Sequence, residues 1–129
     1  MAKIIYLHGF ASSANSTKAL QLKKYILENY SKTEIIIPDI ENNIVDAVQQ
    51  IDKLIEEFSP SALIGSSLGG FYATYFSEQY NLKCVGINPA VIPPAEMSEY
   101  LGENKNYSTG EKFLINQEQL DLLDRMGRE

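Results

Sequence analysis

Ser61-Ala-Leu-Ile-Gly-Ser-Ser-Leu-Gly-Gly70 is the stretch of sequence that decides the fold. Its short apolar run ends in the pentapeptide Gly65-Ser66-Ser67-Leu68-Gly69, and an amphipathic pattern follows at once. A strand, a G-x-S-x-G sequence and a helix in direct succession are typical of a nucleophile elbow, a sharp turn that lifts a serine hydroxyl above the end of a sheet. Such a turn strains Ser67 and crowds the positions two before and two after it. We therefore predict that only glycine fits easily at 65 and 69.

Three further strands and two further helices surround this unit. The apolar runs Ile4 to Leu7, Glu34 to Ile37 and Cys84 to Ile87 predict buried parallel strands. A helical pattern runs from Ala19 to Tyr30. The clearest helix carries apolar residues spaced by four, three, four and three, begins after the capping Asn43 and ends at Ser59-Pro60: Ile44, Val48, Ile51, Ile55 and Phe58.

Strands and helices that alternate in this way predict an α/β fold, a three-layer sandwich around a parallel sheet with right-handed crossovers. The helix from Leu68 to Tyr80 carries bulky aromatic residues, which we interpret as core. Two helices then cover one face and one helix the other. If the elbow strand lies beside the first strand, the order is 2-1-3-4, and the loops after both strands meet at the switch point where ligands bind.

The last third of the chain has a different character. Ala95 to Leu101 predicts a short helix that enters through Pro94 and ends at Gly102. A hairpin turning at Thr109-Gly110 follows, and then a helix capped by Asn116 and Gln119. We expect a single domain over residues 1–129, with the sheet core in 1–90 and a cap or lid in 91–129.

Composition excludes several classes of function. The chain has 129 residues, 44% hydrophobic and 22% charged, with a net charge of −6. This balance is ordinary for one globular domain and argues against nucleic acid as a partner, because no basic stripe is present. The N-terminal residues have no basic region followed by a long apolar core, so we expect no leader peptide. No apolar run approaches membrane-spanning length, and Cys84 is the one cysteine. We expect a cytoplasmic location, no membrane association, and a buried, inert thiol at Cys84.

Acyl transfer by a serine needs a nucleophile, an oxyanion hole and a base oriented by an acid. Ser67 supplies the nucleophile, and the backbone N–H of Leu68 lies in the elbow. Gly9 lets the loop after the first strand fold back and present the N–H of Phe10 as a second donor. The sequence thus supplies two of the three parts.

Three groups of residues carry a family resemblance: His8-Gly9-Phe10, the elbow extended to Thr74, and Asn88-Pro-Ala-Val91. With the segment from Tyr100-Leu-Gly-Glu-Asn104 through Tyr107-Ser-Thr-Gly110, they resemble the YqiA-like esterases of the α/β-hydrolase superfamily over essentially the whole chain. The resemblance implies hydrolysis of a small-molecule carboxylic ester, extending to acyl thioesters, without a metal or organic cofactor. It assigns the nucleophile and oxyanion roles as above, with His8, Gly9, Gly65, Ser66 and Gly69 supporting the motifs.

The chain departs from this family because no histidine follows Ser67, whereas a hydrolase triad runs Ser, acid, His. The sole histidine, His8, belongs to the loop motif and is expected to shape the turn. Of the acids, Asp39 follows the second strand, and Asp121 and Asp124 lie on the last predicted helix, where acids are usually solvated. The triad Asp and His, with the C-terminal portion of the sheet, are therefore expected to be missing from this chain.

Three interpretations follow: an esterase truncated before its triad is complete, a non-catalytic binder of acyl or carboxylate ligands, and an oligomer whose base comes from another chain. The first is preferred. A flavodoxin-like binding domain lacks support, since no phosphate-binding glycine motif is present. If the sheet ends at the strand Cys84 to Ile87, its exposed edge predicts homo-oligomerisation through that strand.

Overall fold

The computed structural model describes residues 2–87, 98–106 and 108–128. Within these ranges, one parallel sheet has the order β2-β1-β3-β4, as predicted. Its strands are β1 (Ala2–Leu7), β2 (Thr33–Ile36), β3 (Ala62–Ser66) and β4 (Lys83–Ile87). Because β1 and β3 are neighbours, with Leu7 beside Gly65, the loops that follow these two strands start side by side.

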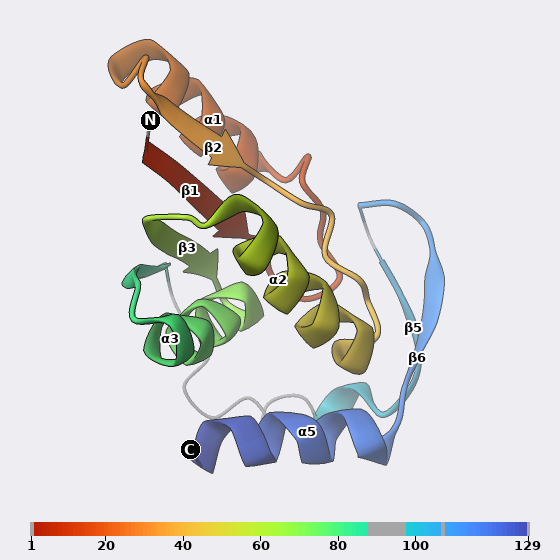
Figure 1. Ribbon diagram of the computed structural model, residues 1–129. Helices are drawn as coiled ribbons and strands as arrows, with labels where there is room; N and C mark the ends of the chain where they lie inside the picture. Colours follow the sequence, from red (N-terminus) through yellow and green to blue (C-terminus); the bar gives the residue numbers. More distant parts are fainter. Residues whose placement is uncertain (1, 88–97, 107, 129) are drawn as a thin grey trace.

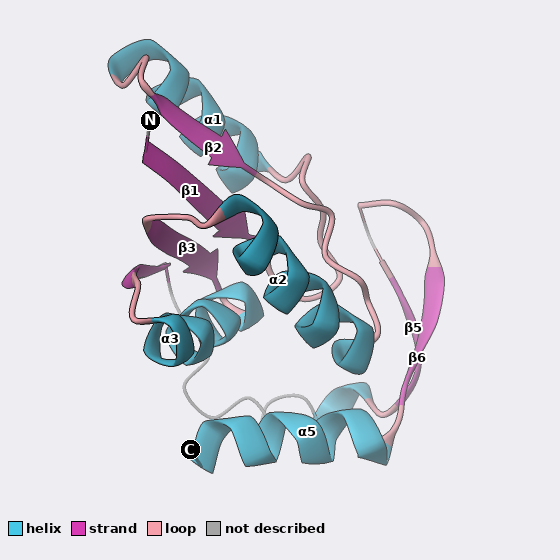
Figure 2. Cartoon of the chain, viewed as in Figure 1, coloured by secondary structure: helices cyan, strands magenta, loops and turns pink. Residues whose placement is uncertain are grey.

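The helices lie on both faces of the sheet, and together they make a three-layer sandwich (Figures 1 and 2). Helix α1 (Thr17–Asn29) lies behind the sheet in Figure 1, whereas α2 (Ile44–Phe58) and α3 (Leu68–Tyr80) lie in front of it. As predicted, two helices cover one face of the sheet and one helix covers the other. The predicted cap of α2 is also present, because the Asn43 side chain accepts from Asp46 N at 3.1 Å.

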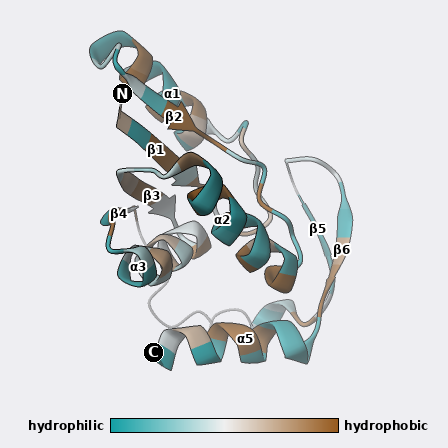
Figure 3. Ribbon diagram, in the orientation of Figure 1, coloured by the Kyte–Doolittle hydropathy of each residue, from teal (hydrophilic) through white to brown (hydrophobic). Residues whose placement is uncertain are grey.

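The hydrophobic core lies between the sheet and the layer of α2 and α3. From the strands, Ile5, Leu7 and Leu63 are fully buried. Hydrophilic and hydrophobic residues alternate along α2 (Figure 3). The apolar face of this helix supplies Ile44, Ala47, Ile51 and Ile55 to the core. The aromatic stripe of α3 is core as predicted, with Phe71, Tyr72 and Phe76 buried. Each such side chain contributes about 1.5–3 kcal/mol through the apolar area it removes from water.

The hairpin and the final helix of the last third are confirmed. Strands β5 (Gly102–Lys105) and β6 (Lys112–Ile115) pair antiparallel, and α5 (Gln117–Arg128) follows. Helix α5 is capped by Asn116, whose side chain accepts from Gln119 N at 3.0 Å. The buried Gln119 side chain in turn accepts from Ile44 N at 2.8 Å, so the same residue caps α2. Leu120, Leu123 and Met126 join the core of α2 and α3.

The short helix expected over Ala95 to Leu101 is present in its described part as a 3₁₀ turn and not as an α-helix. Residues 88–97 lie outside the described ranges, and Ser98–Tyr100 forms a single 3₁₀ turn, η1. The chain then turns at Gly102, whose φ is +105°. The Asn104 amide donates to Tyr100 O at 2.6 Å and to Gly102 O at 3.1 Å.

The expected burial of Cys84 is also wrong, because its side chain is exposed. It lies in β4, an edge strand whose residues from Lys83 to Gly86 are all exposed. Val85 is 54% exposed. An apolar run predicts a strand with both faces covered, but among the described residues little packs on this one. No helix in the described ranges is long and apolar enough to cross a membrane.

Candidate active site

Ser67 lies in a sharp turn between β3 and α3. Its φ of 56° and ψ of −119° are the values of the first central residue of a type II′ turn, a position that favours glycine. Holding an L-residue there costs about 1–3 kcal/mol. The turn is fixed because Ser67 N donates to Ile87 O at 3.1 Å and Gly70 N donates to Ser67 O at 2.9 Å. The Ser67 side chain is exposed, and its hydroxyl has no hydrogen-bond partner among the described residues.

The two glycines of the pentapeptide are required by close backbone approach. A Cβ at Gly65 would lie 2.1 Å from the carbonyl oxygen of Gly69, and a Cβ at Gly69 would lie 2.0 Å from the carbonyl oxygen of Leu7. Neither contact is possible for real atoms, and neither neighbour is a side chain that could rotate away. The predicted need for glycine at both positions is confirmed, and it brings the first turn of α3 directly onto the end of β1.

The loop after β1 contacts the elbow through Gly9. A Cβ at this glycine would lie 3.4 Å from Ser67 Cβ and 4.0 Å from Ser67 Oγ. In the described part of the chain, the backbone N–H groups of Phe10 and Leu68 have no acceptor. Leu68 adjoins Ser67 in the chain, and Phe10 adjoins Gly9, which lies close to Ser67. The positive end of the α3 dipole lies at the same place. Such donors can hold a developing oxyanion.

The side chain of His8 holds this loop in place through two hydrogen bonds. The ring is buried, and Ile40 N donates to its Nε2 at 2.9 Å, so Nδ1 carries the proton and donates to Gly9 O at 2.8 Å. Burial lowers the pKa of His8 from its ordinary 6.5, against smaller opposing effects of the Gly9 bond and the Asp39 charge. With both nitrogens bonded to the main chain, the imidazole is unsuited to act as a general base towards Ser67.

His8 makes stability depend on pH. Because its pKa is lowered in the folded state, the unfolded state takes up the proton first as pH falls through about 6.5. Stability is therefore complete above that pH and decreases below it. We expect urea unfolding to show this loss between pH 7.5 and pH 5. In His8→Gln, whose amide oxygen can accept from Ile40 N without titrating, the loss over this window should be smaller. Equal pH slopes for the two proteins would contradict the assignment.

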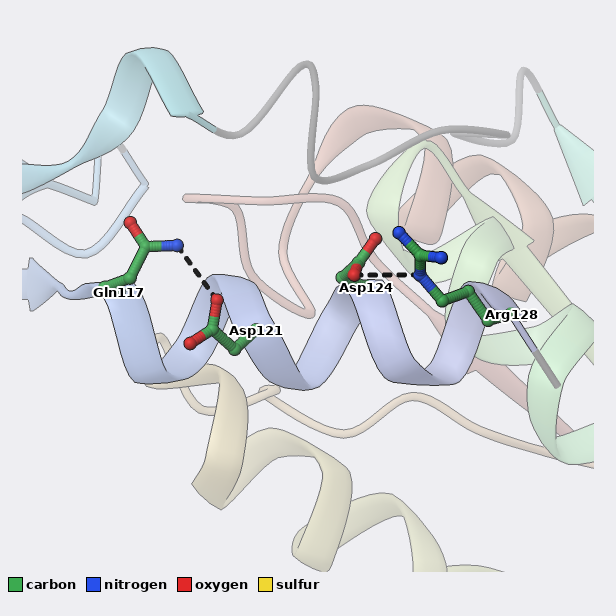
Figure 4. Close-up of polar contacts among 4 residues, drawn as sticks. All are labelled: Gln117, Asp121, Asp124 and Arg128. Atoms are coloured by element: carbon green, nitrogen blue, oxygen red, sulfur yellow. Dashed lines mark hydrogen bonds and ion pairs between the residues drawn. The ribbon is translucent and has the colours of Figure 1, made fainter.

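None of the three candidate acids is oriented as a catalytic partner of a base. Asp39 accepts from Ala14 N at 2.7 Å and so holds the loop after β1. On α5, Gln117 donates to Asp121 at 2.9 Å, and Asp124 pairs with Arg128 at 2.9 Å (Figure 4). Asp124 and Arg128 are 48% and 77% exposed. The helix acids are thus solvated, as expected. In the described residues, no three His, Cys, Asp or Glu side chains gather as a metal site.

Asn106 is the supporting residue that sequence analysis missed. Its side chain is 2% exposed. The amide nitrogen donates to Ser12 O at 2.9 Å and to Asn42 Oδ1 at 2.8 Å. The amide oxygen accepts from Ser108 N at 2.9 Å and from Thr109 N at 3.0 Å. The one signal in the sequence is an asparagine before a turn, which says nothing of the distant partners. Asn106 ties the hairpin turn to the loop that carries Phe10.

The chain matches known proteins over most of its length. A family model described as "Uncharacterised protein family (UPF0227)" covers residues 3–127. UPF0227 protein ECA1814 of Pectobacterium atrosepticum is 31% identical over 108 residues, which is 81% of this chain and 59% of that protein. UPF0227 protein YE1706 of Yersinia enterocolitica is 27% identical over 118 residues, with the same shares. The chain thus spans about 59% of the length of these curated relatives.

Two solved structures share the fold. Alpha/beta hydrolase domain-containing protein 10 from mouse superposes with a TM-score of 0.69 at 15% identity, over 96% of this chain and 61% of that one. Est1E from Butyrivibrio proteoclasticus, with ferulic acid bound, superposes with a TM-score of 0.70 at 12% identity, over 100% of this chain and 61% of that one. At these identities the likeness is one of fold, and the fold is that of the α/β hydrolases. By the match over residues 3–127, the chain belongs to the UPF0227 family, in agreement with its YqiA-like motifs.

Proposed function

We propose that the chain carries the nucleophile and oxyanion hole of a serine esterase that hydrolyses small-molecule carboxylic esters or acyl thioesters. Ser67 is the nucleophile, and the N–H groups of Phe10 and Leu68 are the oxyanion donors. One observation carries the proposal: an exposed, strained Ser67 lies beside two backbone amides that have no acceptor among the described residues. Strain of this kind persists where the surrounding structure imposes it, and it clusters at functional sites.

The chemistry follows from this geometry. Ser67 Oγ attacks the ester carbonyl carbon, the carbonyl electron pair moves to oxygen, and the two amides stabilise the resulting charge, each by about 3–4 kcal/mol. Collapse of this intermediate expels the alcohol or thiol and leaves an acyl-serine, which water cleaves to the acid and free Ser67. Both steps need a base that takes the proton from Oγ or water and returns it to the leaving group.

That base does not come from His8, whose nitrogens are both bonded to backbone groups, and the sequence holds no second histidine. We therefore place the triad acid and base outside these 129 residues, in a longer chain or in a partner. Catalysis by the 129-residue protein should be slow but above that of water, because in other hydrolases removal of a triad member leaves roughly 10³- to 10⁴-fold catalysis.

A fluorophosphonate probe tests the nucleophile directly. We expect slow labelling, with the mass shift mapped to the peptide that contains Ser67, and none in Ser67→Ala. Ser66→Ala is the matched control, since Ser66 adjoins the nucleophile but is buried, and this variant should still label at Ser67. Labelling that persists in Ser67→Ala, or a folded wild-type protein that never labels, would refute the assignment and favour a binder without catalysis. Hydrolysis of p-nitrophenyl acetate by the purified chain at ordinary esterase rates, abolished by Ser67→Ala, would instead show that the purified protein has a general base, donated by a second copy of the chain.

We also propose that two copies associate through the exposed edge of β4. Within the described residues, β4 is the last strand of the sheet, and its Val85 side chain is 54% exposed. Such an edge pairs with another strand unless it is protected. Val85→Glu places a charge at the edge and should shift the protein towards monomer in analytical ultracentrifugation. Leu27→Glu is the control, because Leu27 is equally exposed, at 61%, but lies on α1. A wild-type protein that remains monomeric at high concentration would contradict this proposal.

A further inference from the structure

A hollow of about 510 Å³ lies beside the loop that carries the proposed oxyanion donor Phe10. The hollow is lined by Phe10, Ala11 and Tyr100 and by residues of the β5–β6 hairpin. Ser67 does not line the hollow, but Gly9, the residue before Phe10, lies close to it: a Cβ at Gly9 would be 3.4 Å from Ser67 Cβ. A substrate whose carbonyl lies between Ser67 and the Phe10 amide can therefore extend its other end into this space.

The inner wall of the hollow is aromatic. The Phe10 ring lies 4.7 Å from the Tyr100 ring and 5.5 Å, edge to face, from the Phe113 ring, between centroids. The backbone at Tyr100 is held because the Asn104 amide donates to its carbonyl oxygen at 2.6 Å. Paired rings of this kind offer a large apolar surface in a defined geometry. They suit an apolar or aromatic body and are held in place before any ligand arrives.

Another part of the lining is basic. Lys105 and Lys112 both line the hollow and are directly opposite each other in the antiparallel ladder of β5 and β6. Like charges in that position destabilise a hairpin. Neither lysine forms an ion pair within the described residues, although Glu103 lies on the same wall. The chain as a whole is negative, with a net charge of −6, whereas these two lysines form a positive pair. An anion bound between the two ammonium groups would relieve their repulsion.

We propose that this hollow selects esters with an apolar or aromatic body and an anionic end, a carboxylate or a phosphate. The body packs on Phe10 and Tyr100, and the anion lies between Lys105 and Lys112. Substrate selection by the hollow rests on the proposed ester hydrolysis at Ser67. Binding of such a ligand does not itself require a reactive serine.

The test uses probes that cannot react. Binding of 3-phenylpropionate, of its neutral amide and of 2-phenylethyl phosphate to the 129-residue protein is measured by NMR chemical shifts at low salt. We expect the two anions to bind roughly fivefold or more tighter than the amide, the range that two exposed ion pairs give. Shifts should centre on Phe10 and Tyr100, and the preference should weaken in 0.3 M salt. The stronger of the two anions identifies the anionic group.

Two variants separate the pocket from general surface charge. Lys105→Ala/Lys112→Ala should abolish the preference for the anions over the amide. Lys23→Ala/Lys24→Ala, on the exposed surface of α1, removes the same charge and should retain it. Equal binding of acid and amide to the wild-type protein, equal loss in both double variants, or shifts elsewhere on the surface would overturn the proposal.

The outcome is independent of the nucleophile test. If 3-phenylpropionate binds as expected while the fluorophosphonate fails to label Ser67, the hollow is a binding site and the esterase proposal is wrong. If Ser67 labels and the anion preference is absent, the esterase proposal holds and the selection proposed for this hollow is wrong.

Discussion

Gly69→Ala should destabilise the fold by about 3 kcal/mol or more, at the upper end of what overpacking costs. The added methyl group would lie 2.0 Å from the carbonyl oxygen of Leu7 and 2.5 Å from that of His8. Both are backbone atoms, so relief requires α3 to move away from the end of β1. That movement also separates Ser67 from the loop that carries Phe10, and the loss is large against a typical total stability of about 5–15 kcal/mol.

The measurement is urea unfolding followed by circular dichroism, with fluorophosphonate labelling of Ser67 in the same samples. Gly127→Ala is the matched control, because a Cβ there meets the Phe71 ring at an ordinary 3.6 Å and lies on helix α5. It should leave stability unchanged or raise it by up to about 1 kcal/mol, since alanine is the better helix former. If Gly69→Ala unfolds at the same urea concentration as the wild-type protein, the close packing of α3 on β1 is not present in solution.

Asn106→Ala should cost about 2–4 kcal/mol, because it removes four hydrogen bonds that are partly shielded from solvent, each worth about 1 kcal/mol. The carbonyl of Ser12 loses its donor, and the amides of Ser108 and Thr109 lose their acceptor. The hairpin turn is then joined to the loop after β1 by the hydrogen bond between the Ser13 and Ser108 hydroxyls, without the support of Asn106. We expect hydrogen exchange to accelerate first over β5, β6 and residues 10–14, ahead of the sheet, since the variant removes contacts between loops and not core packing.

Asn29→Ala provides the control for this second experiment. The Asn29 amide also bonds a carbonyl, that of Tyr25 at 2.9 Å, but it is exposed on α1. Its replacement should change stability by no more than about 0.5 kcal/mol. Similar losses in both variants, or unchanged exchange over the hairpin in Asn106→Ala, would show that Asn106 does not join these loops.

The sequence determines the elements where neighbours along the chain carry the information. The four-three spacing of Ile44, Val48, Ile51 and Ile55 specifies α2, and Asn43 specifies its start. The glycines at 65 and 69 specify a crowded turn, and the structure gives the crowding atoms. The alternation of strands and helices specifies a parallel sheet with right-handed crossovers, whereas its order 2-1-3-4 follows only once β3 is known to pair with β1. The spacing, the glycine positions and the alternation follow local rules, so the sequence states them fully.

The tertiary structure alone decides which distant groups meet. The exposure of Cys84 depends on what packs against β4, which a local apolar run cannot record. The fixed tautomer of His8 depends on the amide of Ile40, and the role of Asn106 depends on Ser12 and Asn42. Each of these partners is separated from its residue by dozens of positions in the sequence. Hydrogen bonds and burial of this kind depend on how the whole chain packs, and no short pattern of residues encodes them.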